Sequence, residues 1–143
     1  PATEMWRWTT SPEEAPDEAD LSIRVLTGPE VVSGSTRMKA GTATKLVLNA
    51  ISTLAMVRLG KVYGNLMVDL EVTCEKLQDR GERILSEILD LERREATDLL
   101  RRAEGHVKTA LVMSRLSVGR EEAIRRLERA GGVLATTFGE SES

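Results

Sequence analysis

The pattern of apolar and polar positions changes along the chain and predicts its elements. Residues 21–26 alternate in part between apolar and polar side chains, which predicts a strand. From residue 36 the apolar positions recur at steps of three and four, which predicts a long helix over residues 36–59. This helix is apolar around much of its circumference, so we expect several neighbouring elements to cover it.

The second half of the chain has a different pattern. Gly64 and Asn65 predict a turn, after which a further helix is expected to begin at Leu66. Glycine-containing turns then separate short amphipathic helices, which together predict a small bundle. The expected helices cover residues 82–91, 92–103, 107–116 and 119–130. No internal repeat is evident, and the polar end GESES is expected to be disordered.

These elements divide the chain into three parts. Residues 1–20 are rich in acids and proline and predict a leader or linker, residues 21–80 hold the strand and the long helices, and residues 81–143 hold the bundle. The predicted secondary structure is therefore mostly α-helical, with one strand. A lone strand needs a partner for its backbone groups, so either another chain or a missing half of the same domain must supply one.

The amino-acid composition argues against several classes of function. The formal net charge of -3 gives no general reason to expect nucleic-acid binding, and most basic side chains alternate with acidic ones. Cys74 is the single cysteine and His106 the single histidine, so neither a disulfide nor a zinc cluster nor a Cys/His pair is expected. We expect Cys74 to be buried on an apolar helix face. The apolar stretch 46–60 is short and interrupted, which argues against a membrane span, and without a secretory signal a cytoplasmic location is expected.

The segment 28–45 carries the clearest chemical signal. It joins the strand to the long helix, where open α/β sheets bind ligands. Gly34 allows close approach of backbone N–H groups, and the helix N-terminus favours an anion. Hydroxyl and cationic side chains surround these features: Ser33, Ser35, Thr36, Thr42, Arg37 and Lys39. An ordinary capped helix with solvated cations is the alternative. The spacing matches neither a P-loop nor a dinucleotide-binding loop, which disfavours nucleotides.

Two longer motifs carry a resemblance to a known family. GPEVVSGSTRMKAGTATKLVLNAIST, followed by LGKVYGNLMVDL, closely resembles the signature of N-acetylmuramic acid 6-phosphate etherases, which the glucokinase regulatory proteins of animals share. The resemblance covers residues 19–134. It implies the α/β sugar isomerase (SIS) fold, with residues 21–80 as the C-terminal part of a phosphosugar-binding domain. It also implies that residues 81–143 form a small bundle similar to a ubiquitin-associated fold, and that the protein is a homodimer.

The family reaction implied by this resemblance is a carbon–oxygen lyase reaction in cell-wall amino sugar recycling. It cleaves the D-lactyl ether of N-acetylmuramic acid 6-phosphate to give N-acetylglucosamine 6-phosphate and D-lactate, with neither a metal nor a redox cofactor. The resemblance makes Glu30, Ser33, Ser35, Thr36, Arg37 and Lys39 the expected substrate-binding residues. Glu30 is interpreted as a residue that lines the site or fixes the loop.

The sequence also departs from the family. The two glutamates that serve as general base and general acid in the family lie in motifs of its N-terminal half, and neither motif occurs here. We therefore assign no catalytic residue and expect the isolated chain to be inactive. Two other functions remain open: a non-catalytic sugar-phosphate-binding regulator that resembles the glucokinase regulatory proteins, and an interaction module in which the bundle alone works. The hydroxyl and cationic groups of the loop argue against the last.

Overall fold

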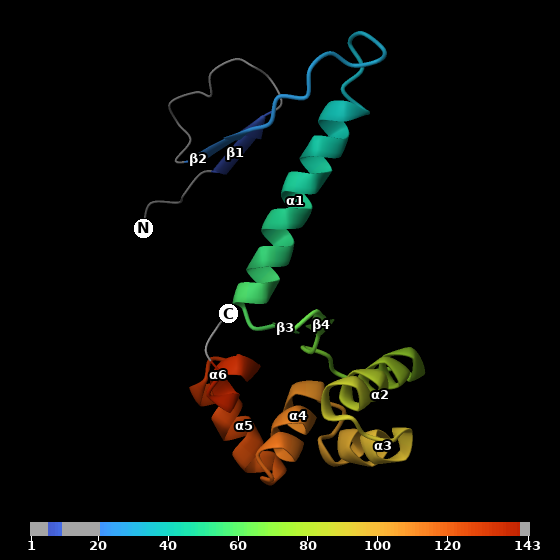
Figure 1. Ribbon diagram of the computed structural model, residues 1–143, viewed down its shortest axis with the longest axis vertical. Coiled ribbons are helices and arrows are strands. Elements are labelled where there is room, and N and C mark those ends of the chain that lie inside the picture. Colours follow the sequence, from blue (N-terminus) through green and yellow to red (C-terminus); the bar gives the residue numbers. More distant parts are fainter. Residues whose placement is uncertain (1–5, 10–20, 141–143) are drawn as a thin grey trace. The chain divides into compact units, whose positions relative to one another are not determined.

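The computed structural model describes residues 6–9 and 21–140, and over this part the protein is mostly helical (Figure 1), as predicted. The chain divides into two compact units, Pro1–Leu54 and Ala55–Ser143, and each is described by itself below. Most of the predicted leader, residues 10–20, and the end of the predicted disordered tail, residues 141–143, lie outside the described residues.

The first unit contains a pair of strands. Strand β1 (Trp6–Thr9) pairs in parallel with β2 (Leu21–Arg24), with Trp6 opposite Leu21. The prediction of one strand is therefore wrong, because the short segment 6–9 was assigned to the leader. The pairing gives β2 a partner within its own chain. Leu21 of β2 is 44% exposed, whereas Ile23, two positions further on, is half-buried.

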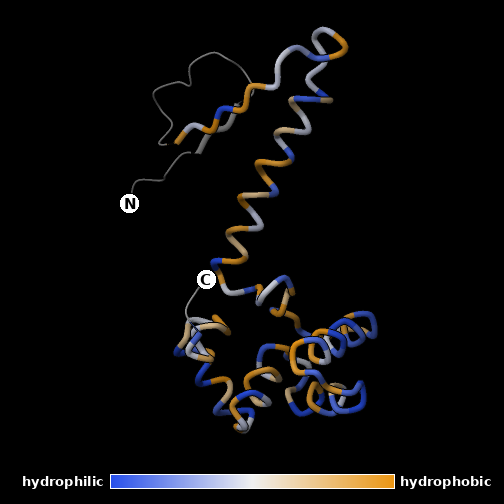
Figure 2. The backbone as a smooth tube through the Cα atoms, in the orientation of Figure 1, coloured by the Kyte–Doolittle hydropathy of each residue, from blue (hydrophilic) through white to orange (hydrophobic). Residues whose placement is uncertain are grey.

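Helix α1 (Lys39–Arg58) follows the loop after β2. It begins three residues later than predicted, since residues 36–38 form turns, and it ends one residue earlier. Apolar positions recur along its length (Figure 2), yet none of its residues is buried. The expected covering neighbours are not among the described residues, and α1 exposes a long apolar surface.

The length of α1 bears on the question of a membrane. The helix has 20 residues, more than the apolar stretch considered from the sequence, and among the described helices it is the one long and apolar enough to cross a membrane. That criterion uses length and composition alone. A helix from the interior of a water-soluble protein meets it equally well.

The second unit opens with a hairpin. Strands β3 (Val62–Tyr63) and β4 (Leu66–Met67) pair antiparallel around Gly64 and Asn65, which confirms the predicted turn. The helix predicted to begin at Leu66 is wrong, because the chain continues in extended form and the next helix starts at Glu75.

The rest of the second unit is a bundle of short helices. It confirms the four predicted helices with shifted ends and adds a fifth, α6, that was not predicted. The helices are α2 (Glu75–Leu89), α3 (Arg93–Arg102), α4 (Val107–Arg115), α5 (Arg120–Arg129) and α6 (Leu134–Phe138). Among the described residues, the buried side chains of this unit form one core.

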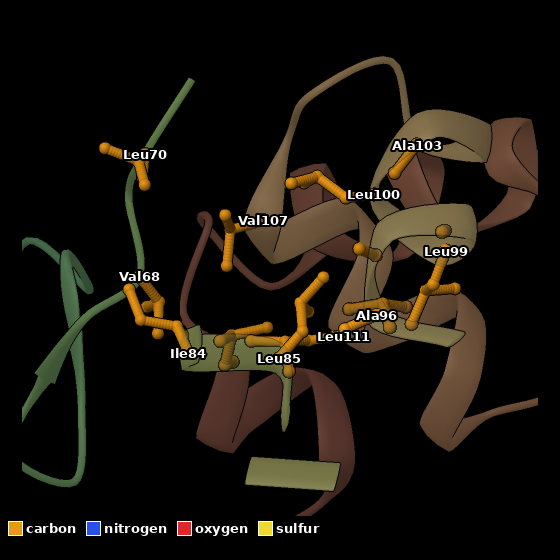
Figure 3. Packing of buried hydrophobic residues seen from close by; sticks show 14 of the residues in the cluster. Val68, Leu70, Ile84, Leu85, Ala96, Leu99, Leu100, Ala103, Val107 and Leu111 are labelled. Atoms are coloured by element: carbon orange, nitrogen blue, oxygen red, sulfur yellow. The ribbon is translucent and has the colours of Figure 1, made fainter. Parts of the chain in front are cut away.

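Figure 3 shows how the extended segment after β4 contributes to that core. Val68 lies beside Ile84 of α2, and the fully buried Leu85 of α2 and Leu111 of α4 lie further along the same cluster, to which Leu70 also belongs. Alternate residues of the segment thus face the bundle, as in a strand with one buried face. Cys74 was expected on a buried helix face, and this is wrong: it is exposed and extended immediately before α2.

Gly60 joins α1 to the hairpin, and its substitution tests how closely this glycine packs against Val133. Its φ is +68°, and an added Cβ would lie 2.9 Å from Val133 Cγ2 and 3.0 Å from Val133 Cα. Gly60→Ala is expected to lower the free energy of unfolding by about 2–3 kcal/mol, through left-handed strain and overlap together. Gly64→Ala is the matched control, because Gly64 has φ +59° but open space around it. It should cost about 1–2 kcal/mol. Equal losses in chemical denaturation would contradict the close packing at Gly60.

Candidate functional site

The loop between β2 and α1 is built around two glycines with positive φ. β2 ends at Arg24, two residues earlier than predicted, and Gly28 follows in the loop with φ +69°; Gly34 has φ +84° inside a turn closed by the Ser35 N–H, which donates to the Val32 carbonyl at 3.0 Å. Both conformations favour glycine over other residues. The loop therefore reverses the chain and leads directly into the first turn of α1.

Glu30 caps α1 from nine residues upstream. Its carboxylate accepts hydrogen bonds from the backbone N–H groups of Lys39 and Ala40, both at 3.0 Å. The bond from Ala40 and then that from Lys39 lower the pKa of Glu30 below its usual value of 4.5. The cap is thus intact at neutral pH, and its contribution to stability is lost only as the pH falls through that lowered value.

The first turn of α1 is therefore less open to an external anion than the sequence predicted. Besides the two N–H groups that Glu30 binds, Gly41 N–H donates to the Thr36 carbonyl and Thr42 N–H to the Met38 carbonyl, both at 2.9 Å. The expectation that unpaired N–H groups at this helix end would hold an anion is wrong for these four groups. An anion in the loop would have to use side chains.

The six residues predicted to bind substrate fall into two sets. Glu30 and Lys39 are committed to the loop itself, since the Lys39 ammonium donates to the Pro29 carbonyl at 2.9 Å. The other four form no side-chain hydrogen bond or ion pair with the described part of the chain. They are Ser33, Ser35, Thr36 and Arg37, of which Ser35 is half-buried and the rest are exposed.

The second motif, LGKVYGNLMVDL, is joined to the helical bundle by polar contacts. The Asp69 carboxylate pairs with Lys61 at 2.7 Å and with Lys108 at 3.0 Å, and Lys108 also donates to the Gly132 carbonyl at 3.0 Å. The hydrogen bond from Lys61 is the largest cause that lowers the pKa of Asp69. Sequence reasoning missed this cluster, because Lys108 lies 39 positions after Asp69 and no local pattern connects them.

Tyr63 of the same motif makes a second contact with the bundle. Its hydroxyl donates to the Glu140 carboxylate at 3.0 Å and accepts from Arg115. The Arg115 guanidinium lies 4.7 Å from the ring centre of Phe138, within cation–π distance. The motif LGKVYGNLMVDL therefore fastens the hairpin to the bundle through polar contacts as well as through its apolar side chains.

Over residues 6–9 and 21–140, no group of three or more His, Cys, Asp and Glu side chains could hold a metal ion. Arg37 is the cation of the loop that remains open among the described residues. The loop thus presents hydroxyl groups and one guanidinium, which are groups that can hydrogen-bond a small anion.

Comparison with known proteins identifies the relatives. The chain is 56% identical over 121 residues to N-acetylmuramic acid 6-phosphate etherase of Mycolicibacterium smegmatis, covering 85% of this chain and 41% of that protein. It is 54% identical over 121 residues to the etherase of Synechocystis sp., with 85% and 40% covered, and 53% identical over 114 residues to that of Geobacillus sp., with 80% and 39% covered. No family model matches the chain.

These comparisons confirm the resemblance read from the two motifs. This chain is related to the N-acetylmuramic acid 6-phosphate etherases over most of its own length. It spans about 40% of the length of these relatives, as a C-terminal segment of them.

Proposed function

We propose that the chain is the C-terminal part of an N-acetylmuramic acid 6-phosphate etherase and that its loop 28–45 binds the phosphosugar. The single observation that carries the proposal is the identity of 51–56% to proteins of that name over 80–88% of this chain. The loop supports it with four open polar side chains held on a fixed backbone. A cytoplasmic location belongs to the same proposal.

The loop residues take two roles in this proposal. Ser33, Ser35 and Thr36 donate hydroxyl hydrogen bonds to the phosphosugar, and Arg37 supplies a guanidinium that can hold a phosphate through two N–H groups. Glu30 and Lys39 fix the loop rather than contact the ligand. Their hydrogen bonds to the start of α1 and to Pro29 support this division of the predicted set.

The fold proposed for the whole protein is the sugar isomerase (SIS) fold. The parallel pairing of β1 with β2 and the order strand, loop, helix support it, because parallel sheets are built from such units. Residues 21–80 would then form the C-terminal part of the phosphosugar domain. Residues 81–143 would form a bundle similar to a ubiquitin-associated fold, which its short helices support. The remaining part of the domain would cover α1, as in a core helix of a water-soluble protein.

The chemistry of the proposed reaction needs groups beyond this chain. Cleavage of the D-lactyl ether requires a base that removes the proton next to the sugar aldehyde and an acid that protonates the departing lactate, and water must then add to the unsaturated intermediate to give N-acetylglucosamine 6-phosphate. Glu30 is a poor candidate for the acid, since its lowered pKa keeps it ionised at neutral pH and both of its oxygens accept hydrogen bonds from α1. We therefore place both carboxyl groups in the part of the enzyme that precedes this chain. The regulator reading is disfavoured because the relatives reported above are etherases by name.

Binding of N-acetylglucosamine 6-phosphate tests the role of the loop. The chain is expected to bind it weakly, and Arg37→Ala should weaken binding roughly 10- to 100-fold, the usual worth of a charge-assisted hydrogen bond. Arg58→Ala is the matched control, since Arg58 is exposed at the other end of α1 and has no ion pair with the described residues. Titration calorimetry or NMR gives the affinity. An equal loss in both variants would contradict the assignment of Arg37.

Self-association follows from the uncovered helix. A helix with as much exposed apolar surface as α1 is expected to pair with a second copy, so the chain should be a homodimer through α1 and the segment 61–70. Sedimentation velocity across micromolar concentrations measures this. A single monomeric species over the whole range would contradict it.

A further inference from the structure

The bundle contains one helix–turn–helix unit twice, which corrects the reading that the sequence has no internal repeat. Helix α3 begins at Arg93 and α5 at Arg120, both have 10 residues, and the helices after them, α4 and α6, begin at Val107 and Leu134. Every one of these starting points is displaced by 27 positions. The first unit is residues 93–111 and the second is residues 120–138.

The two turns have the same backbone conformation. Glu104 and Gly105 have φ of 53° and 82°, and the equivalent Gly131 and Gly132 have 62° and 78°. The hydrogen bonds repeat as well: Gly105 N–H donates to the Leu100 carbonyl at 3.0 Å, and Gly132 N–H donates to the Leu127 carbonyl at 2.7 Å. Two consecutive residues in the left-handed region are uncommon, so their repetition is specific.

The sequences agree with this superposition. Eight of the 19 aligned positions are identical, and they include the buried alanine and leucine that face the core from each first helix. The identical pairs are Arg93/Arg120, Glu95/Glu122, Ala96/Ala123, Leu100/Leu127, Arg102/Arg129, Ala103/Ala130, Gly105/Gly132 and Thr109/Thr136. The two turns are therefore equivalent surfaces of one duplicated unit.

The first turn holds an extended segment of the chain. Val72 N–H donates to the Gly105 carbonyl at 3.1 Å, and Val107 N–H donates to the Leu70 carbonyl at 3.2 Å, so that Glu71 and His106 form an antiparallel bridge. The turn of this unit thus accepts a strand through main-chain hydrogen bonds. The Leu70 carbonyl and the Val72 N–H lie on the edge of the segment that faces the turn. The N–H and carbonyl of Glu71 lie on the opposite edge.

The second turn packs against Gly60 instead, where an added Cβ would lie 3.1 Å from the Gly132 carbonyl oxygen, and no strand among the described residues bridges to it by main-chain hydrogen bonds. The Gly132 carbonyl, which corresponds to that of Gly105, accepts instead from the Lys108 ammonium. Beside this turn lies an open cavity of about 560 Å³, a volume usual for ligand sites. Its lining includes Gly131 and Gly132 of the second turn, Asp69 and Glu71 of the extended segment, and Lys108 and Glu128.

The charge of this cavity selects a basic occupant. Asp69 pairs with both Lys61 and Lys108, and this group of three carries one net positive charge, so the acidic surplus of the cavity comes from Glu71 and Glu128. Glu71 and Glu128 are exposed and form no ion pair with residues of the described ranges. These two unpaired carboxylates lie on the rim of the cavity, beside a backbone edge where the N–H and carbonyl of Glu71 are open to the described residues. Together they complement an extended peptide that carries a cationic side chain.

We propose that the cavity beside the Gly131–Gly132 turn binds an extended segment of a partner protein that carries a basic side chain. The segment adds to the edge at Glu71 by main-chain hydrogen bonds, and its other side lies along the Gly131–Gly132 turn without bonding the Gly132 carbonyl, which Lys108 occupies. Its Lys or Arg side chain pairs with Glu71 and Glu128. This surface is independent of the phosphosugar loop and of the proposed etherase reaction.

An NMR titration of the ¹⁵N-labelled full chain tests the proposal. The probe is a capped pentapeptide, valine-leucine-lysine-valine-threonine, and the comparison peptide has glutamate in place of lysine. We expect the basic peptide to shift the amide signals of Glu71, Gly131 and Gly132 with millimolar affinity, and the acidic peptide to bind at least about tenfold more weakly. Shifts confined to other residues, equal affinity for the two peptides, or no shift at millimolar peptide would overturn the proposal.

Charge reversal on the rim supplies the matched variants. Glu128→Lys and Glu71→Lys are each expected to weaken binding of the basic peptide several-fold, and together roughly tenfold. Glu87→Lys is the control, because Glu87 is an exposed carboxylate of α2 that does not line the cavity. If Glu71→Lys disturbs the spectrum outside the cavity, Glu128→Lys alone decides. An unchanged affinity in Glu128→Lys would contradict the role of the rim.

Discussion

Leu111→Ala is expected to lower the free energy of unfolding of the second unit by about 3–5 kcal/mol, because it leaves a cavity in the core of the bundle. Leu111 lies on α4, is fully buried and packs in the cluster that α2, α3 and the segment after β4 share. Small domains commonly have about 5–15 kcal/mol in total, so the loss would remove a large part of the stability. Chemical denaturation followed by circular dichroism measures it.

Lys76→Ala is the control for this prediction. Lys76 is exposed on α2 and has no ion pair with the described residues, so its loss should stay within about 0.5 kcal/mol. A cost for Leu111→Ala no larger than that of Lys76→Ala would show that the described core does not hold the bundle together.

Addition of the proposed N-terminal part is expected to have the largest effect. General acid–base steps contribute about 10²–10⁴-fold each, so two absent carboxyl groups would account for roughly 10⁴-fold or more in rate. A mixture of this chain with the separately expressed N-terminal part of the Mycolicibacterium smegmatis relative should therefore release D-lactate at least about 10⁴-fold faster than the chain alone. The N-terminal part alone is the control. A mixture in which the two parts associate but show no release would contradict the proposed division of the enzyme.

The helices of the bundle were predictable from periodicity, and the connections between them were less so. The three-to-four spacing of apolar residues located α3, α4 and α5 within a few residues. The segment after Leu66 was misread, although Leu66, Val68 and Leu70 alternate as in a strand, because the longer helical pattern that follows was extended backwards. Helix α6 has five residues, too few for a period to emerge.

The parts of the candidate site that depend on contacts between residues distant in the sequence could not be predicted. No local pattern indicates the cap from Glu30, because a carboxylate that reaches a helix nine residues downstream follows none of the usual capping spacings. The cluster of Lys61, Asp69 and Lys108 depends on the packing of the hairpin on α4 in the same way. The duplicated unit, in contrast, had a signal: a comparison of the chain with itself at an offset of 27 finds it.

D-lactate release from N-acetylmuramic acid 6-phosphate by the purified chain tests the proposed division of the enzyme. In that proposal the loop holds the groups for the phosphosugar and the proton-transfer groups lie elsewhere in the enzyme. The expected result is no release above background for the chain and for Glu30→Gln alike. Clear turnover by the chain that disappears in Glu30→Gln would contradict the account and make Glu30 the catalytic carboxylate.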